Sequence, residues 1–190
     1  MTLQEYLIDL KPMSEGKANE IAGFFEAETI CKGNLLVQEG KTSQHSFFLE
    51  EGIVRCYTLD LNGDEVTTRL FSAPDFINDY RSFFRREASQ ENYEAVTDLK
   101  VQKIGWENVQ HCFHSIPDFR EWGRMMLTMN YVHLQEQMLS MHKESARERY
   151  ENLLRNRPEI IQNVPVHIVA SYLGVTKFSL SRIRKEVSSN

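Results

Sequence analysis

Basic and polar side chains near the C-terminus form a stripe that could bind nucleic acid. Lys177, Ser181 and Lys185 recur at helical spacing, and Phe178 and Arg182 lie beside them. Guanidinium and ammonium groups donate hydrogen bonds to phosphates and to the edge of guanine, and an aromatic ring can contact a thymine methyl group. The alternative is an ordinary helical hairpin with a solvated basic face.

The residues around this stripe predict two short helices joined by a tight turn. Gly174 permits positive φ in the turn, and Thr176 can cap the second helix. Leu180 and Ile183 then face the first helix, where Ala170 is small enough for a close crossing. This pattern is typical of a helix-turn-helix, so we expect the second helix to bind DNA. Thr176 and Ser179 are expected to contact phosphates. The residues expected to contact DNA are Thr176, Lys177, Phe178, Ser179, Ser181, Arg182 and Lys185.

The distribution of charge supports this interpretation. The chain of 190 residues carries 22 basic and 27 acidic residues, a net charge of −5, which as a total would count against nucleic acid. Residues 146–190, however, hold eight basic and four acidic residues, so the remainder of the chain is strongly acidic. We expect two units with different partners, the acidic one repelling DNA.

A β-rich region precedes the helical end of the chain. From about residue 29 to 104, short β-prone runs alternate with glycine turns, as in a β-sandwich or barrel. Asn62-Gly63 predicts a type I′ hairpin, because both positions tolerate positive φ. Two helical segments come before it, and the second is expected to run from a cap at Ser14 through Phe25.

A long helix is expected from Asp118 to about Lys143, spanning ~38 Å. Its apolar residues recur at 3-4 spacing, which is typical of a coiled-coil seam. The helix could pack against its own domain or against a second copy of the chain. Glu136 falls among these apolar residues of the long helix and counts somewhat against a seam, because a buried unpaired carboxylate is costly. The candidate dimer-interface residues are Trp122, Met125, Met129, Val132 and Leu139.

Together these segments resemble the Crp/Fnr family of bacterial transcription regulators. The resemblance covers roughly residues 20–187 and rests on KGNLLVQEG (32–40), FFLEEGIVRCY (47–57), APDF (73–76), SARERYENLL (145–154) and ASYLGVTKFSLSRIRK (170–185). It implies an α+β fold with a cyclic-nucleotide-binding-type β-roll (a jelly roll) over 1–116, a dimerisation helix over 117–143 and a helix-turn-helix DNA-binding domain over 144–190. It also implies a homodimer on palindromic promoter DNA, with RNA polymerase as a further partner, and favours the dimer seam.

The positions that hold cyclic AMP in the family are altered in this chain. Asn78-Asp79 replaces the Gly-Glu pair that takes the ribose, and Ser89-Gln90 replaces the Arg-Ser pair that neutralises the phosphate. Without the guanidinium, the phosphate loses a charge-assisted bidentate contact. We expect cyclic nucleotides to bind weakly or not at all. Large apolar residues could simply fill the roll; an effector pocket would involve Phe71, Asn78, Asp79, Tyr80, Ser89 and Gln90.

The recognition helix also departs from the family's best-known DNA code, in which an Arg-Glu pair opens the helix and a second Arg follows. Lys177 and Phe178 replace the pair, and Arg182 matches the second Arg. The resemblance therefore assigns guanine recognition to Arg182 and implies a different target sequence. The family's hairpin wings have no counterpart here, so we expect a compact, wingless unit.

Other functional classes find little support. Cys31, Cys56 and Cys112 are too widely spaced for the family's iron–sulfur cluster, and His45 alone lies in the β-rich region, too few ligands for haem or a cupin metal. No P-loop, nucleophile elbow or membrane-length apolar run is present. We expect a cytoplasmic protein with no cofactor, metal or catalytic activity. The alternative function is a ligand-binding regulatory module that acts through protein partners, its helix-turn-helix degenerate.

Overall fold

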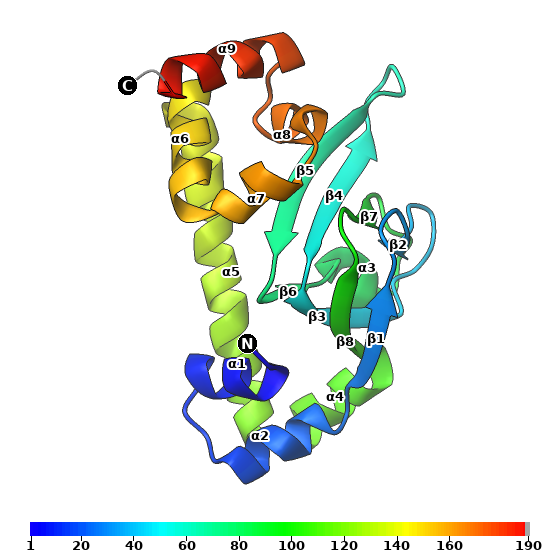
Figure 1. The fold of residues 1–190 in the computed structure, drawn as a ribbon. Coiled ribbons are helices and arrows are strands. Elements are labelled where there is room, and N and C mark those ends of the chain that lie inside the picture. Colours follow the sequence, from blue (N-terminus) through cyan, green and yellow to red (C-terminus); the bar gives the residue numbers. More distant parts are fainter. Residues whose placement is uncertain (189–190) are drawn as a thin grey trace.

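The computed structural model describes residues 1–188 and has a mixed α+β architecture (Figure 1). Two short helices come first, a β-sandwich follows, and helices make up most of the remaining described residues, through 188. The helices are α1 (Leu3–Leu10), α2 (Glu15–Ala22), α3 (Tyr80–Arg85), α4 (Trp106–Ser115), α5 (Pro117–Lys143), α6 (Ala146–Asn156), α7 (Pro158–Asn163), α8 (Val166–Tyr172) and α9 (Lys177–Ser188).

The strands form two four-stranded antiparallel sheets, in the orders β1-β8-β3-β6 and β2-β7-β4-β5. Apolar side chains of both sheets, such as Leu49, Val54 and Tyr93, share one core, because alternate residues of a strand point to the same face. The strands are β1 (Glu26–Ile30), β2 (Leu35–Val37), β3 (His45–Glu51), β4 (Ile53–Leu59), β5 (Glu65–Ser72), β6 (Asp75–Ile77), β7 (Asn92–Ala95) and β8 (Leu99–Gly105).

The predicted end of the second helix is wrong. The helix capped by Ser14 ends at Ala22 rather than Phe25, because Gly23 closes it and the chain turns directly into β1.

The hairpin between β4 and β5 also differs from its prediction. Its loop spans five residues, 60–64, and of the predicted Asn62-Gly63 pair only Gly63 has positive φ, at 85°. The Asp60 carboxylate accepts hydrogen bonds from the amides of Asn62 and Asp64, at 2.8 and 3.0 Å. These bonds stabilise a longer loop, so the type I′ prediction is wrong.

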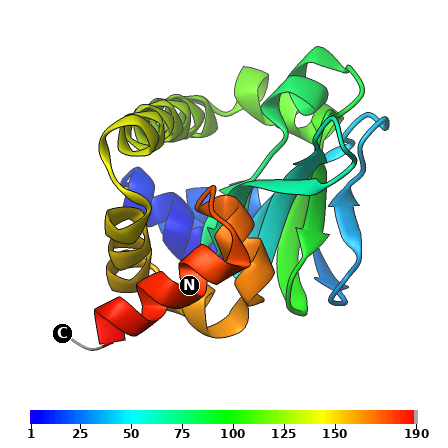
Figure 2. The same cartoon turned by 90° about the horizontal axis from the view of Figure 1, so that it is seen from above.

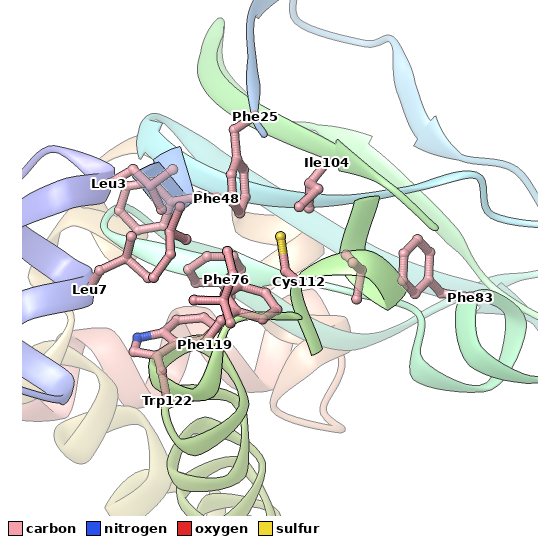
Figure 3. Close-up of a cluster of buried hydrophobic side chains, with 13 residues drawn as sticks. Leu3, Leu7, Phe25, Phe48, Phe76, Phe83, Ile104, Cys112, Phe119 and Trp122 are labelled. Atoms are coloured by element: carbon pink, nitrogen blue, oxygen red, sulfur yellow. The ribbon is translucent and has the colours of Figure 1, made fainter. Parts of the chain in front are cut away.

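The first turns of α5 lie inside an apolar core that they share with α1 and α4 (Figure 3). The Trp122 ring lies 5.0 Å from that of Phe76 on β6 and 5.6 Å from that of Phe119. Trp122 is only 2% exposed within its own chain. Its predicted place in a dimer interface is therefore wrong, because the surrounding core already encloses the side chain.

Of the C-terminal helices, α7 and α8 pack against β5, and α6 and α9 pack against these two helices and each other (Figures 1 and 2). Ile168 of α8 and Ile160 of α7 belong to the same apolar cluster as Leu70 of β5. The Thr67 amide donates to the Ser171 hydroxyl at 2.9 Å. Both apolar and polar contacts thus hold these helices to the sandwich. Residues 189–190 of the predicted DNA-binding domain lie outside the described residues.

Candidate nucleic-acid interface and ligand cavity

The turn between α8 and α9 fixes the direction of α9. Gly174 has a φ of 67°, a conformation that L side chains rarely adopt. The Val175 amide donates to the Ala170 carbonyl at 3.0 Å, which closes the end of α8. Thr176 Oγ1 accepts from the Ser179 amide at 3.1 Å and so caps the start of α9. The sequence therefore predicted the local geometry of this turn correctly.

One face of α9 is buried and the other is open. Leu180 and Ile183 are 1% and 7% exposed in the cluster shared with α6 and α8. On the opposite face Phe178 is 82% exposed, although burial of a phenylalanine is strongly favourable. The Arg182 side chain is 72% exposed, and its nearest carboxylate, on Glu186, is 3.8 Å away. Of the predicted DNA-contact residues, all are exposed except Ser179, which is half-buried under the Thr176 cap.

The shaft of α5 carries exposed apolar side chains. Met129, Val132 and Leu139 are 57%, 47% and 52% exposed, and Met125 is half-buried. At 100° per residue they lie on the side of the helix that faces away from the sandwich. Glu136, between them, is exposed, with its carboxylate 4.0 Å from the His133 ring.

A cavity of about 430 Å³ lies between the sandwich, α5 and the junction of α6 and α7. This volume is within the range of small-molecule binding sites. Asn130 Nδ2 donates to the Tyr80 hydroxyl at 2.6 Å and so links α5 to α3 across one wall. The lining residues are Arg69, Leu70, Phe71, Asp75, Phe76, Asn78, Tyr80, Leu127, Asn130, Tyr131, His133, Leu134, Gln137 and Arg157.

The cavity includes half of the predicted effector residues. Phe71, Asn78 and Tyr80 line it, whereas Asp79, Ser89 and Gln90 do not. Each of the latter three has a structural partner instead. Asp79 caps α3 by accepting from the Ser82 amide at 3.0 Å, Ser89 Oγ donates to the Glu91 carbonyl at 2.8 Å, and Gln90 Oε1 accepts from Arg81 at 2.5 Å. Their predicted placement in the pocket is therefore wrong.

Three charged lining residues, Arg69, Asp75 and Arg157, were not predicted. Arg69 lies two residues before Phe71 on β5, so strand alternation places both side chains on one face and could have identified it. Asp75 lies in the APDF segment. Arg157 has no local sequence signal, because only the packing of α6 and α7 on β5 brings it to the cavity.

The charge of Arg69 is compensated within the sandwich. Its Nη2 donates to the Glu91 carboxylate at 2.6 Å and to the Tyr93 hydroxyl at 2.5 Å. Its guanidinium also lies 5.6 Å from the ring centroid of Phe71, a cation–π distance. Arg69 is thus a fixed, neutralised part of the cavity wall.

Asp75 has no such compensation. Its Oδ1 accepts from the Phe76 amide at 2.8 Å, and among residues 1–188 no basic group lies within 4.0 Å of its carboxylate. Burial raises the pKa of Asp75 from 3.8 to about 6, an effect that Arg157 partly offsets. Its titratable and charged surroundings are Tyr6 on α1, Arg69, Tyr80, His133 and Arg157.

The raised pKa predicts a stability cost. As the pH rises from about 4 to 6, unfolded Asp75 loses its proton while the folded form retains it, so folding stability falls over this window. Asp75→Asn removes the charge and keeps the bond from the Phe76 amide. We expect this variant to be more stable than the parent by about 1–3 kcal/mol at pH 8 and equally stable near pH 4. Denaturant unfolding across that range measures the difference; a gain that is independent of pH would contradict the assignment.

Comparisons with known proteins agree with this architecture. Residues 27–115, which span β1 to α4, match the model of the cyclic nucleotide-binding domain family. An uncharacterized protein of Haemophilus influenzae is 26% identical over 94 residues, which cover 50% of this chain and 72% of that protein.

Solved structures of regulators have the same fold at low sequence identity. The catabolite activator protein of Thermus thermophilus is 17% identical with a TM-score of 0.58, and the match covers 96% of this chain and 86% of that one. The c-di-GMP-responsive global regulator CLP of Xanthomonas campestris is 13% identical with a TM-score of 0.71, covering 93% and 92%. FixK2 of Bradyrhizobium japonicum is 16% identical with a TM-score of 0.70, covering 87% and 85%.

The chain therefore has a β-sandwich of the cyclic nucleotide-binding type followed by C-terminal helices, and its fold matches those of these regulators. This confirms the mixed α+β fold predicted from the sequence. Within residues 1–188 no helix is both long and apolar enough to cross a bilayer.

Proposed function

We propose that this protein is a homodimeric, DNA-binding transcriptional regulator of the Crp/Fnr type. Residues 1–116 would form its sensor, 117–143 its dimerisation helix and 144–190 its DNA-binding domain. The observation that carries the proposal is α9, a capped helix with an apolar inner face and an open face that presents Phe178 and Arg182. Such a protein would act in the cytoplasm, beside RNA polymerase.

Dimerisation would place two copies of α9 on one face of the DNA. The exposed side chains of Met129, Val132 and Leu139, with half-buried Met125, supply an apolar seam for a second α5. Two-fold symmetry then requires half-sites one helical turn apart, about 34 Å.

The cavity supports a small-molecule effector other than cyclic AMP. Asp79, Ser89 and Gln90, which stand at the family's ribose and phosphate positions, are bonded within α3 and the following loop. Arg69 is held by Glu91 and Tyr93. We therefore expect cyclic nucleotides to bind weakly or not at all, which titration calorimetry with cyclic AMP would test; micromolar binding would contradict it.

Arg182→Ala tests the assignment of α9 as the DNA-reading element. Because a bidentate arginine–guanine pair discriminates between bases, the variant should lose about 1–3 kcal/mol of binding free energy at one base position. Specificity at that position should relax, while phosphate-dependent affinity at the other positions remains. Both effects can be measured by binding to a DNA site selected from a random library and to a panel of its single-base variants.

Arg85→Ala is the matched control, since it removes the same charge from an exposed position on α3. It should leave both affinity and specificity unchanged. A loss of equal size for every base variant would reassign Arg182 to a phosphate contact.

A second candidate is a ligand-binding module that acts through a protein partner. The 82% exposed ring of Phe178 favours it, because an open aromatic side chain is also typical of a protein interface. DNA footprints that weaken steeply with salt would exclude this candidate.

A further inference from the structure

Two charges of opposite sign line the cavity without neutralising each other. Asp75 and Arg157 both belong to the wall, and the charge of Arg157 acts on the Asp75 carboxylate. Yet no ion pair within 4.0 Å joins any acidic group of residues 1–188 to Arg157. Since Glu91 compensates Arg69, the wall presents one free negative and one free positive group.

Each of these groups keeps hydrogen-bonding capacity for a ligand. Asp75 uses Oδ1 for the Phe76 amide and has no described partner at Oδ2. Arg157 uses Nη2 for the Leu70 carbonyl at 2.7 Å and the Ser72 hydroxyl at 3.2 Å, and has no described partner at Nε or Nη1. The cavity therefore offers an acceptor from β6 and donors from the junction of α6 and α7.

Asn78 provides independent evidence for a ligand. The residue lines the cavity, is only 5% exposed, and its Oδ1 is buried without a hydrogen-bond partner. A buried acceptor left unpaired costs about 1–3 kcal/mol, so native structures rarely retain one without a reason. A bound N–H donor would satisfy Asn78 and Asp75 together.

The rest of the wall is apolar and aromatic. Phe71, Phe76 and Tyr80 come from the sandwich and α3, and Leu127 and Leu134 from α5. Leu127 is 43% exposed and Leu134 58% exposed, a sign that this wall has room for a further apolar group. A flat hydrophobic body could replace water against these side chains.

We propose that the cavity binds a small zwitterion with an aromatic or similarly flat apolar body, its ammonium group donating to Asp75 and Asn78 and its carboxylate accepting from Arg157. An aromatic α-amino acid is the simplest member of this class. The proposal rests on the role of the cavity as the effector site. Ligand binding would also be coupled to the C-terminal helices. Arg157 ties α6 and α7 to β5 and would contact the ligand directly.

The test is titration calorimetry on the full chain without DNA. The probes are L-tryptophan and L-phenylalanine, with tryptamine and 3-indolepropionate as analogues that keep only the ammonium or only the carboxylate. At least one of the two amino acids should bind. Tryptamine and 3-indolepropionate should each bind at least about tenfold more weakly than L-tryptophan, because each analogue loses one charge-assisted contact.

Variants assign the two ends of the ligand. Asp75→Asn should weaken binding of the amino acid at least about tenfold without weakening 3-indolepropionate, and its expected gain in stability separates this loss from unfolding. Arg157→Gln should show the converse preference, for tryptamine. Asp64→Asn, in the exposed β4–β5 loop, and Arg155→Gln, exposed on α6, are the charge-matched controls and should change nothing.

Three results would overturn the proposal: no heat from either amino acid at millimolar concentration, equal binding of tryptophan and 3-indolepropionate, or binding that Asp75→Asn leaves unchanged. The titration contains no DNA, so a negative result would overturn the ligand proposal without bearing on the DNA-binding proposal. Conversely, a protein that binds the amino acid but not DNA would support the ligand proposal and contradict the DNA-binding proposal.

Discussion

Val132→Glu combined with Leu139→Glu should convert the proposed dimer to a monomer and weaken the proposed DNA binding about 100-fold or more. The two side chains are 47% and 52% exposed on the seam of α5, seven residues apart. In a parallel dimer each new carboxylate would face its own copy, and the apolar contact would be lost. The monomer loses the gain in effective concentration that links two half-sites, which commonly exceeds 100-fold.

The chain offers a closely matched control for this pair. Gln135→Glu with His142→Glu places two carboxylates at the same seven-residue spacing, on exposed positions outside the seam. Sedimentation equilibrium and DNA titration should give parent-like values for the control and a monomer for the seam variant. Unchanged dimerisation of the Val132/Leu139 variant would remove this face of α5 from the interface.

Trp122→Ala should lower the free energy of unfolding by about 3–5 kcal/mol, the usual cost of truncating a buried tryptophan. Trp122 is 2% exposed, and its ring lies 5.0 Å from that of Phe76 on β6. The loss should therefore appear in the unfolding of each chain. The dissociation constant of the folded dimer should not change.

Denaturant unfolding at two protein concentrations, together with sedimentation on the folded variant, separates these effects. Phe178→Ala is the control, because it removes an aromatic ring that is 82% exposed and should cost little stability. If Trp122→Ala instead weakened dimerisation and left unfolding unchanged, Trp122 would belong to the interface after all.

Local sequence patterns predicted the elements that depend on neighbouring residues. The α8–α9 turn is determined by Gly174, the Thr176 cap and the 3-4 spacing of Leu180 and Ile183, all within ten residues of one another. The long helix and the β-rich region likewise follow from periodicity. The order of these elements then carried the resemblance, and the mixed α+β fold that it implied is confirmed.

Predictions that depended on long-range packing were less accurate. Spacing alone placed Trp122 in the α5 seam, but Phe76 of β6 draws it into the core. The cavity brings together β5, β6, α5 and Arg157, which lies about 85 residues along the chain from its partner Ser72. No local pattern could indicate that contact. Asp79 stands at the family's ribose-binding position and was therefore placed in the effector pocket, but its carboxylate caps α3 instead.

Selection of bound sequences from a random DNA library by the purified full chain tests the central claim most directly. The account predicts a two-fold symmetric site with half-sites about 34 Å apart, bound with an affinity that falls steeply as salt rises. Recovery of no enriched sequence, or of binding that is insensitive to salt, would contradict the assignment of this protein as a DNA-binding regulator.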